Sequence, residues 1–101
     1  MPIEKPHKTL EQLRETDPVG YEIIYNFFMH VARQLSKNNP VAAHFGIEYI
    51  HEQLFLLHED GLIKPVYCEK DKVIRLQAYN FAENEYQPWE MDDYPVEERD
   101  E

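Results

Sequence analysis

Residues 47–63 read IEYIHEQLFLLHEDGLI, and the fold of the chain depends on how this stretch is interpreted. Its apolar residues recur at three- and four-residue spacing, which predicts an amphipathic helix over about residues 47–60. The inner line of that helix is Ile50, Leu54 and Leu57. Gly61 stands where a helix C-terminus prefers a left-handed backbone, and a β-rich run follows at once. The stretch therefore predicts a helix that stops at a glycine and leads directly into a strand.

Upstream, the sequence supplies further helix starts. Asp17 is an N-cap carboxylate, and Pro18 suits the first position of a long helix. The apolar stripe of that helix is Val19, Ile23, Ile24, Phe27, Phe28, Val31 and Leu35. Asn39 then caps a short helix, PVAAHF, which Gly46 stops or bends. Thr9 is an N-cap for a short amphipathic helix or turn within the first 16 residues.

Downstream, LIKPVYC and VIRLQAYNF are β-rich runs on either side of the polar turn EKDK, residues 69–72. This arrangement predicts a β-hairpin. Pro65 confines the first strand to a sheet edge or marks a bulge, because proline has no N–H to donate. Beyond about Ala82 acids and prolines become frequent, and independent packing of that segment is not expected.

The segment NPVAAHFGIEYIHEQLFLLHEDGLI resembles the winged helix-turn-helix superfamily, most specifically in its ending of Leu54, Leu57 and Gly61-Leu62-Ile63. The resemblance implies an α+β fold, a small winged helix-turn-helix domain over residues 17–82 with three helices and a β-hairpin wing. An N-terminal segment, residues 1–16, and an acidic aromatic tail, residues 83–101, flank it. IRLQAYNFAEN resembles the segment after the wing in small phage-type winged-helix proteins, where the chain turns into a last helix. Residues 78–86 are therefore expected to be either strand or helix.

Charge divides the 101-residue chain unevenly. The net charge is −10, and residues 83–101 hold nine acids against one base, which leaves only −2 for residues 1–82. The single cysteine, Cys68, excludes an internal disulfide and favours a reducing compartment. No apolar run approaches the roughly 20 residues that cross a bilayer. We expect a cytoplasmic protein without a membrane segment.

The predicted third helix has no Lys or Arg. DNA-binding members of the superfamily present polar and cationic side chains to the major groove from this helix. The corresponding positions here are Ile47, Glu48, Tyr49, His51, Glu52 and Phe55. A sequence-specific DNA-binding regulator would have to rely on Tyr49 and Gln53 from the helix and on cations of the wing, Lys70, Lys72 and Arg75. DNA affinity depends mainly on cations, so we expect DNA binding less than protein binding.

Phe55 and Leu56 have two interpretations. They pack against the first long helix or the N-terminal segment, or they join Tyr49, Glu52 and Gln53 in a surface for a protein partner or a second copy of the chain. The tail residues Tyr86, Trp89, Met91 and Tyr94 have three. In the first, Tyr86 and Trp89 fold back onto the domain and staple the hairpin. In the second, the segment orders on binding a partner with a basic surface, and in the third its closely spaced carboxylates imitate a row of phosphates.

The sequence predicts no catalytic, metal or cofactor site. His44, His51 and His58 are seven residues apart, which separates helical side chains by about 10 Å, too far to share one ion. We expect these imidazoles to face solvent. Cys68 has no base or orienting group nearby in the sequence and is expected to be a small buried residue. The leading hypothesis is a non-enzymatic interaction module or regulator, such as an acidic, phage-type inhibitor of a nucleic-acid-binding protein.

Overall fold

Each of the first three helices begins at the side-chain cap that the sequence predicts. The structure is a computed structural model that describes residues 3, 9–89 and 94–95. Thr9 and Gln12 form a reciprocal capping box, the Asp17 carboxylate accepts from the Gly20 N–H at 3.0 Å, and the Asn39 side chain accepts from the Val41 N–H at 2.9 Å. The helices are α1 (Leu10–Thr16), α2 (Pro18–Asn38), α3 (Pro40–Phe45) and α4 (Ile47–Glu59).

Glycines separate α4 from its neighbours. Gly46, at φ 85°, lies between α3 and α4, and Gly61, at φ 77°, follows α4. A side chain at either position would strain the backbone, so these glycines set where the helices stop. The predicted helix ends are confirmed.

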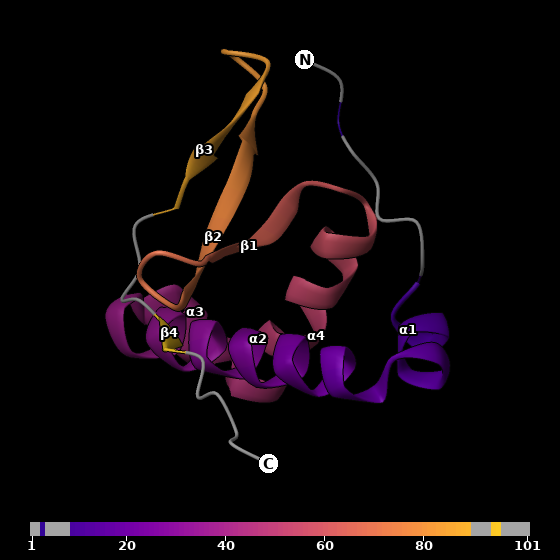
Figure 1. The fold of residues 1–101 in the computed structure, drawn as a ribbon. Helices are drawn as coiled ribbons and strands as arrows, with labels where there is room; N and C mark the ends of the chain where they lie inside the picture. The colour runs from indigo at the N-terminus through magenta and orange to yellow at the C-terminus, as the bar shows by residue number, and fades with distance from the viewer. Residues whose placement is uncertain (1–2, 4–8, 90–93, 96–101) are drawn as a thin grey trace.

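The strands form one small antiparallel sheet around a central strand (Figure 1). They are β1 (Ile63–Cys68), β2 (Val73–Asn80), β3 (Glu85–Pro88) and β4 (Tyr94–Pro95). β1 pairs with β2 from Ile63 opposite Ala78 to Cys68 opposite Val73, as the predicted hairpin requires. On the other side of β2, β3 pairs with the second half of β2, and β4 pairs with the first two residues of β2. The described residues thus form an α+β domain of four helices and a small sheet.

The structure decides between the strand and helix alternatives for residues 78–86 and extends the sheet past residue 82. Residues 78–86 are not helical, because β2 continues to Asn80 and β3 begins at Glu85. The folded part does not end at residue 82, since β3 and β4 complete the sheet. The Asn80 side chain accepts from the backbone N–H groups of Ala82 and Glu83, and this side-chain-capped turn reverses the chain into β3.

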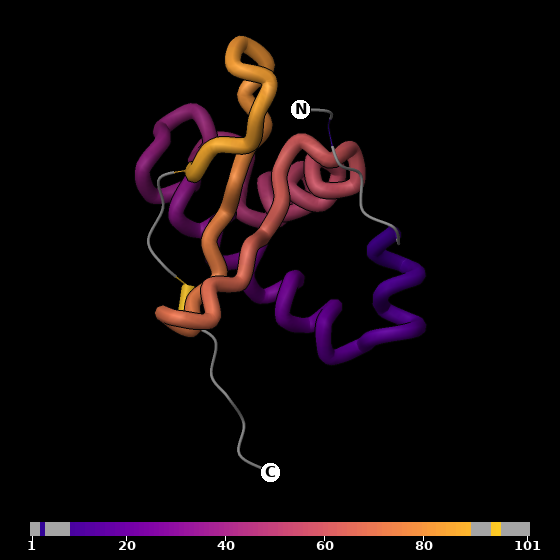
Figure 2. The backbone as a smooth tube through the Cα atoms, turned by 45° about the horizontal axis from the view of Figure 1, so that its top comes forward, coloured from indigo at the N-terminus to yellow at the C-terminus, as the bar shows by residue number. Residues whose placement is uncertain are grey.

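The hairpin of β2 and β3 extends beyond the helices (Figures 1 and 2). The body beneath it is held together by the middle of α2, where Phe27, Phe28, Val31 and Ala32 are at most 2% exposed. These residues pack with Ile50 and Leu54 of α4 and with the buried sheet residues Ile63, Ile74 and Leu76. The core therefore joins α2, α4 and the sheet, and it holds α4 in a fixed rotation about its own axis.

Three prolines lie along the outer edges of the sheet, where another strand could otherwise pair. The Tyr79 N–H donates to the Leu62 carbonyl at 2.8 Å, so odd-numbered residues of β2 bond toward β1 and even-numbered residues bond toward β3 and β4. By the same alternation, Pro65, Pro88 and Pro95 lie where the backbone nitrogen faces away from β2. These positions offer no N–H to an added strand, which protects the sheet edges from pairing with another chain.

Replacing Tyr94 by alanine is expected to lower the free energy of unfolding. The Tyr94 ring lies 5.7 Å from the Phe27 ring, edge to face, and packs on the core through a two-residue strand. The loss should be about 1–3 kcal/mol, less than for a fully buried aromatic residue. Urea unfolding followed by Trp89 fluorescence measures it. Tyr67→Ala is the matched control, because Tyr67 is 46% exposed on β1. Equal effects of the two substitutions would mean that β4 adds no stability.

Candidate functional site

The outward face of α4 carries four of the five helix residues predicted to bind a partner. Tyr49, Glu52, Gln53 and Leu56 have the spacing i, i+3, i+4 and i+7, which places them along one side of a helix. Tyr49 and Leu56 are each 49% exposed, Glu52 is exposed and Gln53 is half-buried. The geometry therefore brings these residues together on one surface.

The fifth residue, Phe55, points to the inner side of α4. Its ring lies 5.2 Å from the Phe28 ring and 5.9 Å from the Tyr25 ring, both on α2, and it packs against the core. The interpretation of Phe55 as a residue that packs against the long helix is confirmed, whereas Leu56 remains on the surface.

His51 is buried, so the expectation that it faces solvent is wrong. Its side chain is 6% exposed, and its Nε2 lies 3.1 Å from the Tyr25 carbonyl oxygen of α2, with which a protonated Nε2 forms a hydrogen bond. The ring also makes edge contacts with Tyr25 and Phe55. Hydrogen bonding and ring contacts together explain how a polar side chain is accommodated between α4 and α2.

His58 also lies on the inner side of α4, against Phe28, and its Nδ1 atom is buried without a hydrogen bond of normal geometry in the described part of the chain. Burial lowers the pKa of His58 below 6.5, because the charged imidazolium loses solvation. Contact with the Ile63 backbone and the Glu59 carboxylate raises the pKa by a smaller amount.

Sequence reasoning missed the other half of this surface, which α3 supplies. Phe45 and Val41, four residues apart on α3, are 54% and 68% exposed. The Phe45 ring stacks on the Tyr49 ring, with centroids 5.2 Å apart and planes 25° apart. The i, i+4 spacing of two large apolar residues in a six-residue helix was the signal available in the sequence. We call Val41, Phe45, Glu48, Tyr49, Glu52, Gln53 and Leu56 the α3–α4 surface.

The α3–α4 surface is apolar and acidic. From Pro40 to Glu59 the chain has three glutamates and neither Lys nor Arg. Glu48 and Glu52 are exposed and four residues apart, so they lie on one side of α4 beside Tyr49. A group that enters this surface meets aromatic rings and carboxylates together.

The cations predicted to contact DNA lie elsewhere. Lys70 and Lys72 are in the turn between β1 and β2, and Arg75 follows on β2, where it pairs with Asp71 at 3.0 Å. This turn adjoins β4, which lies in front of α2 in Figure 1, whereas α4 crosses behind α2. The contacts of α2 agree, since Phe27 meets Tyr94 and Phe28 meets Phe55, and neighbouring positions point to different sides of a helix. Tyr49 and Gln53 are thus not brought together with these cations.

Three of the four predicted tail residues make contacts within the domain. The Tyr86 hydroxyl donates to the Gly61 carbonyl at 2.7 Å, and the Lys64 ammonium lies 4.1 Å from the centre of the Tyr86 ring. Trp89 and Tyr94 pack against the core. The interpretation that Tyr86 and Trp89 fold back onto the domain is confirmed. Met91 lies outside the described residues.

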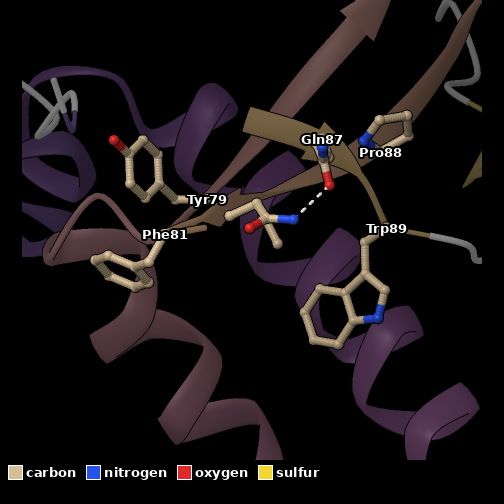
Figure 3. Close-up of a pocket in the computed structure, with 7 residues that line it drawn as sticks. Tyr79, Phe81, Gln87, Pro88 and Trp89 are labelled. Carbon is tan, nitrogen blue, oxygen red and sulfur yellow. Dashed lines mark hydrogen bonds between the residues drawn. The ribbon is translucent and has the colours of Figure 1, made fainter. Parts of the chain in front are cut away.

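A hollow of about 420 Å³ lies on the projecting hairpin of β2 and β3 (Figure 3). It is lined by Ala78, Tyr79, Asn80, Phe81, Gln87, Pro88 and Trp89. The Asn80 amide donates to Gln87 at 2.8 Å, and its oxygen already accepts from two backbone N–H groups of the turn. These polar groups hold the turn in place.

Metal ligands do not gather in the described part of the chain, where no three His, Cys, Asp or Glu side chains could hold one ion. Cys68 is half-buried, and its Sγ lies 3.7 Å from the Asp71 carboxylate. None of the described helices combines the length and the apolar character needed to cross a bilayer. Comparison of the chain with protein-family models, curated proteins and solved structures gave no match.

The lowered pKa of His58 predicts a loss of stability in mild acid. The unfolded chain binds a proton at His58 near pH 6.5, and the folded chain binds it only at lower pH. The stability contributed by neutral His58 is therefore fully present above 6.5 and is lost as the pH falls through the folded-state pKa. Urea unfolding at about pH 7 and about pH 5 gives the free energy of unfolding at each pH. Between these two pH values, this free energy should fall less for His58→Gln than for the unmodified chain. His44→Gln, at an exposed histidine, should lose as much as the unmodified chain. Equal losses for both variants would contradict the prediction.

Proposed function

We propose that this protein is a non-enzymatic, cytoplasmic interaction module, a winged helix-turn-helix domain whose α3–α4 surface binds a protein partner with a basic surface. The observation that supports it most is the exposed aromatic pair Phe45 and Tyr49 beside Glu48 and Glu52, on a segment with no cation. Aromatic anchors in a patch depleted of Lys are typical of protein interfaces. The winged-helix assignment rests on the order of a long helix, a short helix, a glycine turn, a second helix and a hairpin.

A nucleic-acid partner fits this surface poorly. Phosphates are bound by cations that release counterions, and Glu48 and Glu52 would instead repel them. The turn between β1 and β2 offers little compensation. From Glu69 to Arg75 the chain has two acids against three bases, and the Arg75 guanidinium already contacts Asp71. A chain with a net charge of −10 would also repel DNA as a whole.

A second copy of the chain fits less well than a basic partner. In a twofold interface through the α3–α4 surface, the same patch meets itself, so Glu48 and Glu52 of both copies would come close together. Buried carboxylates of like sign are costly unless cations pair with them. A partner that contributes cations removes this cost and also covers Tyr49 and Leu56. Proteins that hold nucleic acid present such basic surfaces, so an acidic inhibitor of a nucleic-acid-binding protein is the regulator that fits best.

DNA binding is expected to be absent. A fluorescein-labelled 20-base-pair duplex, titrated at low salt and followed by anisotropy, should show no saturation below about 100 μM, which is weaker than ordinary nonspecific binding. The matched variant replaces Lys70, Lys72 and Arg75 by alanine. Binding that weakens with salt and is lost in this variant would favour a DNA-binding regulator instead.

The carboxylates of the α3–α4 surface are expected to contribute to binding of a cationic probe. The probe is a labelled decapeptide of alternating lysine and alanine, and the variant is Glu48→Gln/Glu52→Gln. An exposed ion pair contributes about 0.2–1 kcal/mol, so two lost pairs should weaken binding several-fold. Glu11→Gln/Glu15→Gln is the control, because it removes the same charge at the same spacing from exposed positions of α1. Equal weakening in both variants would mean that net charge alone attracts the probe, which contradicts a specific surface.

A further inference from the structure

Phe45 and Tyr49 combine a stacked arrangement of their rings with exposure to solvent. Ring pairs such as Phe28 with Phe55 lie in or beside the core. On the hairpin of β2 and β3, the exposed Phe81 ring meets the half-buried Tyr79 ring edge to face. Phe45 and Tyr49 stack at 5.2 Å with both side chains about half exposed, at 54% and 49%. Stacking orders the two rings, and about half of each residue stays accessible to a ligand. Such a platform presents π-electron density at a fixed place on the surface.

Carboxylates stand beside this platform. Glu52 lies one helical turn from Tyr49 on the same side of α4, and Glu48 lies one turn before Glu52. Gln53, also one turn from Tyr49, adds an amide that donates and accepts hydrogen bonds. A group lying over the Tyr49 ring would therefore have acceptors for its N–H groups on one side.

The two features together select among cations. A guanidinium is flat, weakly hydrated and carries five N–H donors, so it stacks on an aromatic face while its edge bonds a carboxylate. A lysine ammonium is compact and strongly hydrated, and it gains less from a flat ring. We infer that the Phe45–Tyr49 stack is an arginine-binding site, in which a guanidinium of the protein partner lies on the rings and bonds the Glu52 carboxylate. This inference rests on the proposed function, because it names the residue type that the basic partner must supply.

The test compares two labelled decapeptides that differ only in the cation, one alternating arginine with alanine and the other alternating lysine with alanine. The full chain is titrated with each at the same salt concentration. The arginine peptide should bind roughly two- to five-fold more tightly, as expected for a cation–π contact at an exposed site. Tyr49→Leu keeps an apolar side chain but removes the ring, and it should abolish this preference. Tyr67→Leu makes the same change at a similarly exposed tyrosine of β1 and should preserve it.

The outcomes separate the inference from the function on which it rests. Arginine preference that is lost in Tyr49→Leu and retained in Tyr67→Leu supports both. Equal affinity for the two peptides, with both weakened by Glu48→Gln/Glu52→Gln and not by the α1 control, overturns the arginine site and leaves the basic-partner function in place. An arginine preference that survives Tyr49→Leu also overturns the site. No binding of either peptide up to about 1 mM overturns both proposals. The binding free energy of a basic peptide at this surface would then be weaker than about 4 kcal/mol.

Discussion

The fold depends on the middle of α2, which is buried from two sides at once. Phe27 and Phe28 are adjacent in sequence and therefore point in different directions around the helix, yet both are at most 2% exposed. Phe27 meets Tyr94 of β4 and Phe28 meets Phe55 of α4, so the helix is held between the sheet side and α4. With Val31 and Ala32 also fully buried, little space remains for α4 to rotate or shift. The packing of α2 thus determines which face of α4 reaches the surface.

The rotation of α4 explains the character of the α3–α4 surface. His51, a polar residue that sequence alone places outside, is drawn inward by the Tyr25 carbonyl and by ring contacts with Tyr25 and Phe55. Its burial leaves Tyr49, Glu52 and Leu56 as the exposed line. At the same time, prolines whose nitrogens face outward block strand addition along the sheet edges. The helical surface is therefore better suited to a partner than the sheet is.

Local features of this chain were predictable from sequence, and features that depend on distant contacts were not. Helix ends depend on residues only a few positions away, so local sequence patterns are sufficient to predict them. The caps are Thr9, Asp17 and Asn39, and the stops are Gly46 and Gly61. β3 and β4 were missed because they are short, proline-containing and acidic, and they form only by pairing with β2. For the site, helical spacing predicted Tyr49, Glu52, Gln53 and Leu56 correctly as neighbours. The stack of Phe45 on Tyr49 crosses the glycine turn, and no periodicity within one helix predicts it.

The position of the aromatic residues bears on how an acidic chain can bind selectively. Most of the net negative charge lies in residues 83–101, and charge of that density attracts any cation over distances comparable to the Debye length, about 8–10 Å. Such attraction speeds encounter but discriminates poorly between basic partners. The α3–α4 surface differs because its two glutamates flank an ordered, apolar platform, where contact requires a cation of suitable shape at short range. Discrimination is therefore expected to come from the helical surface, and the acidic segment contributes mainly to the rate of association.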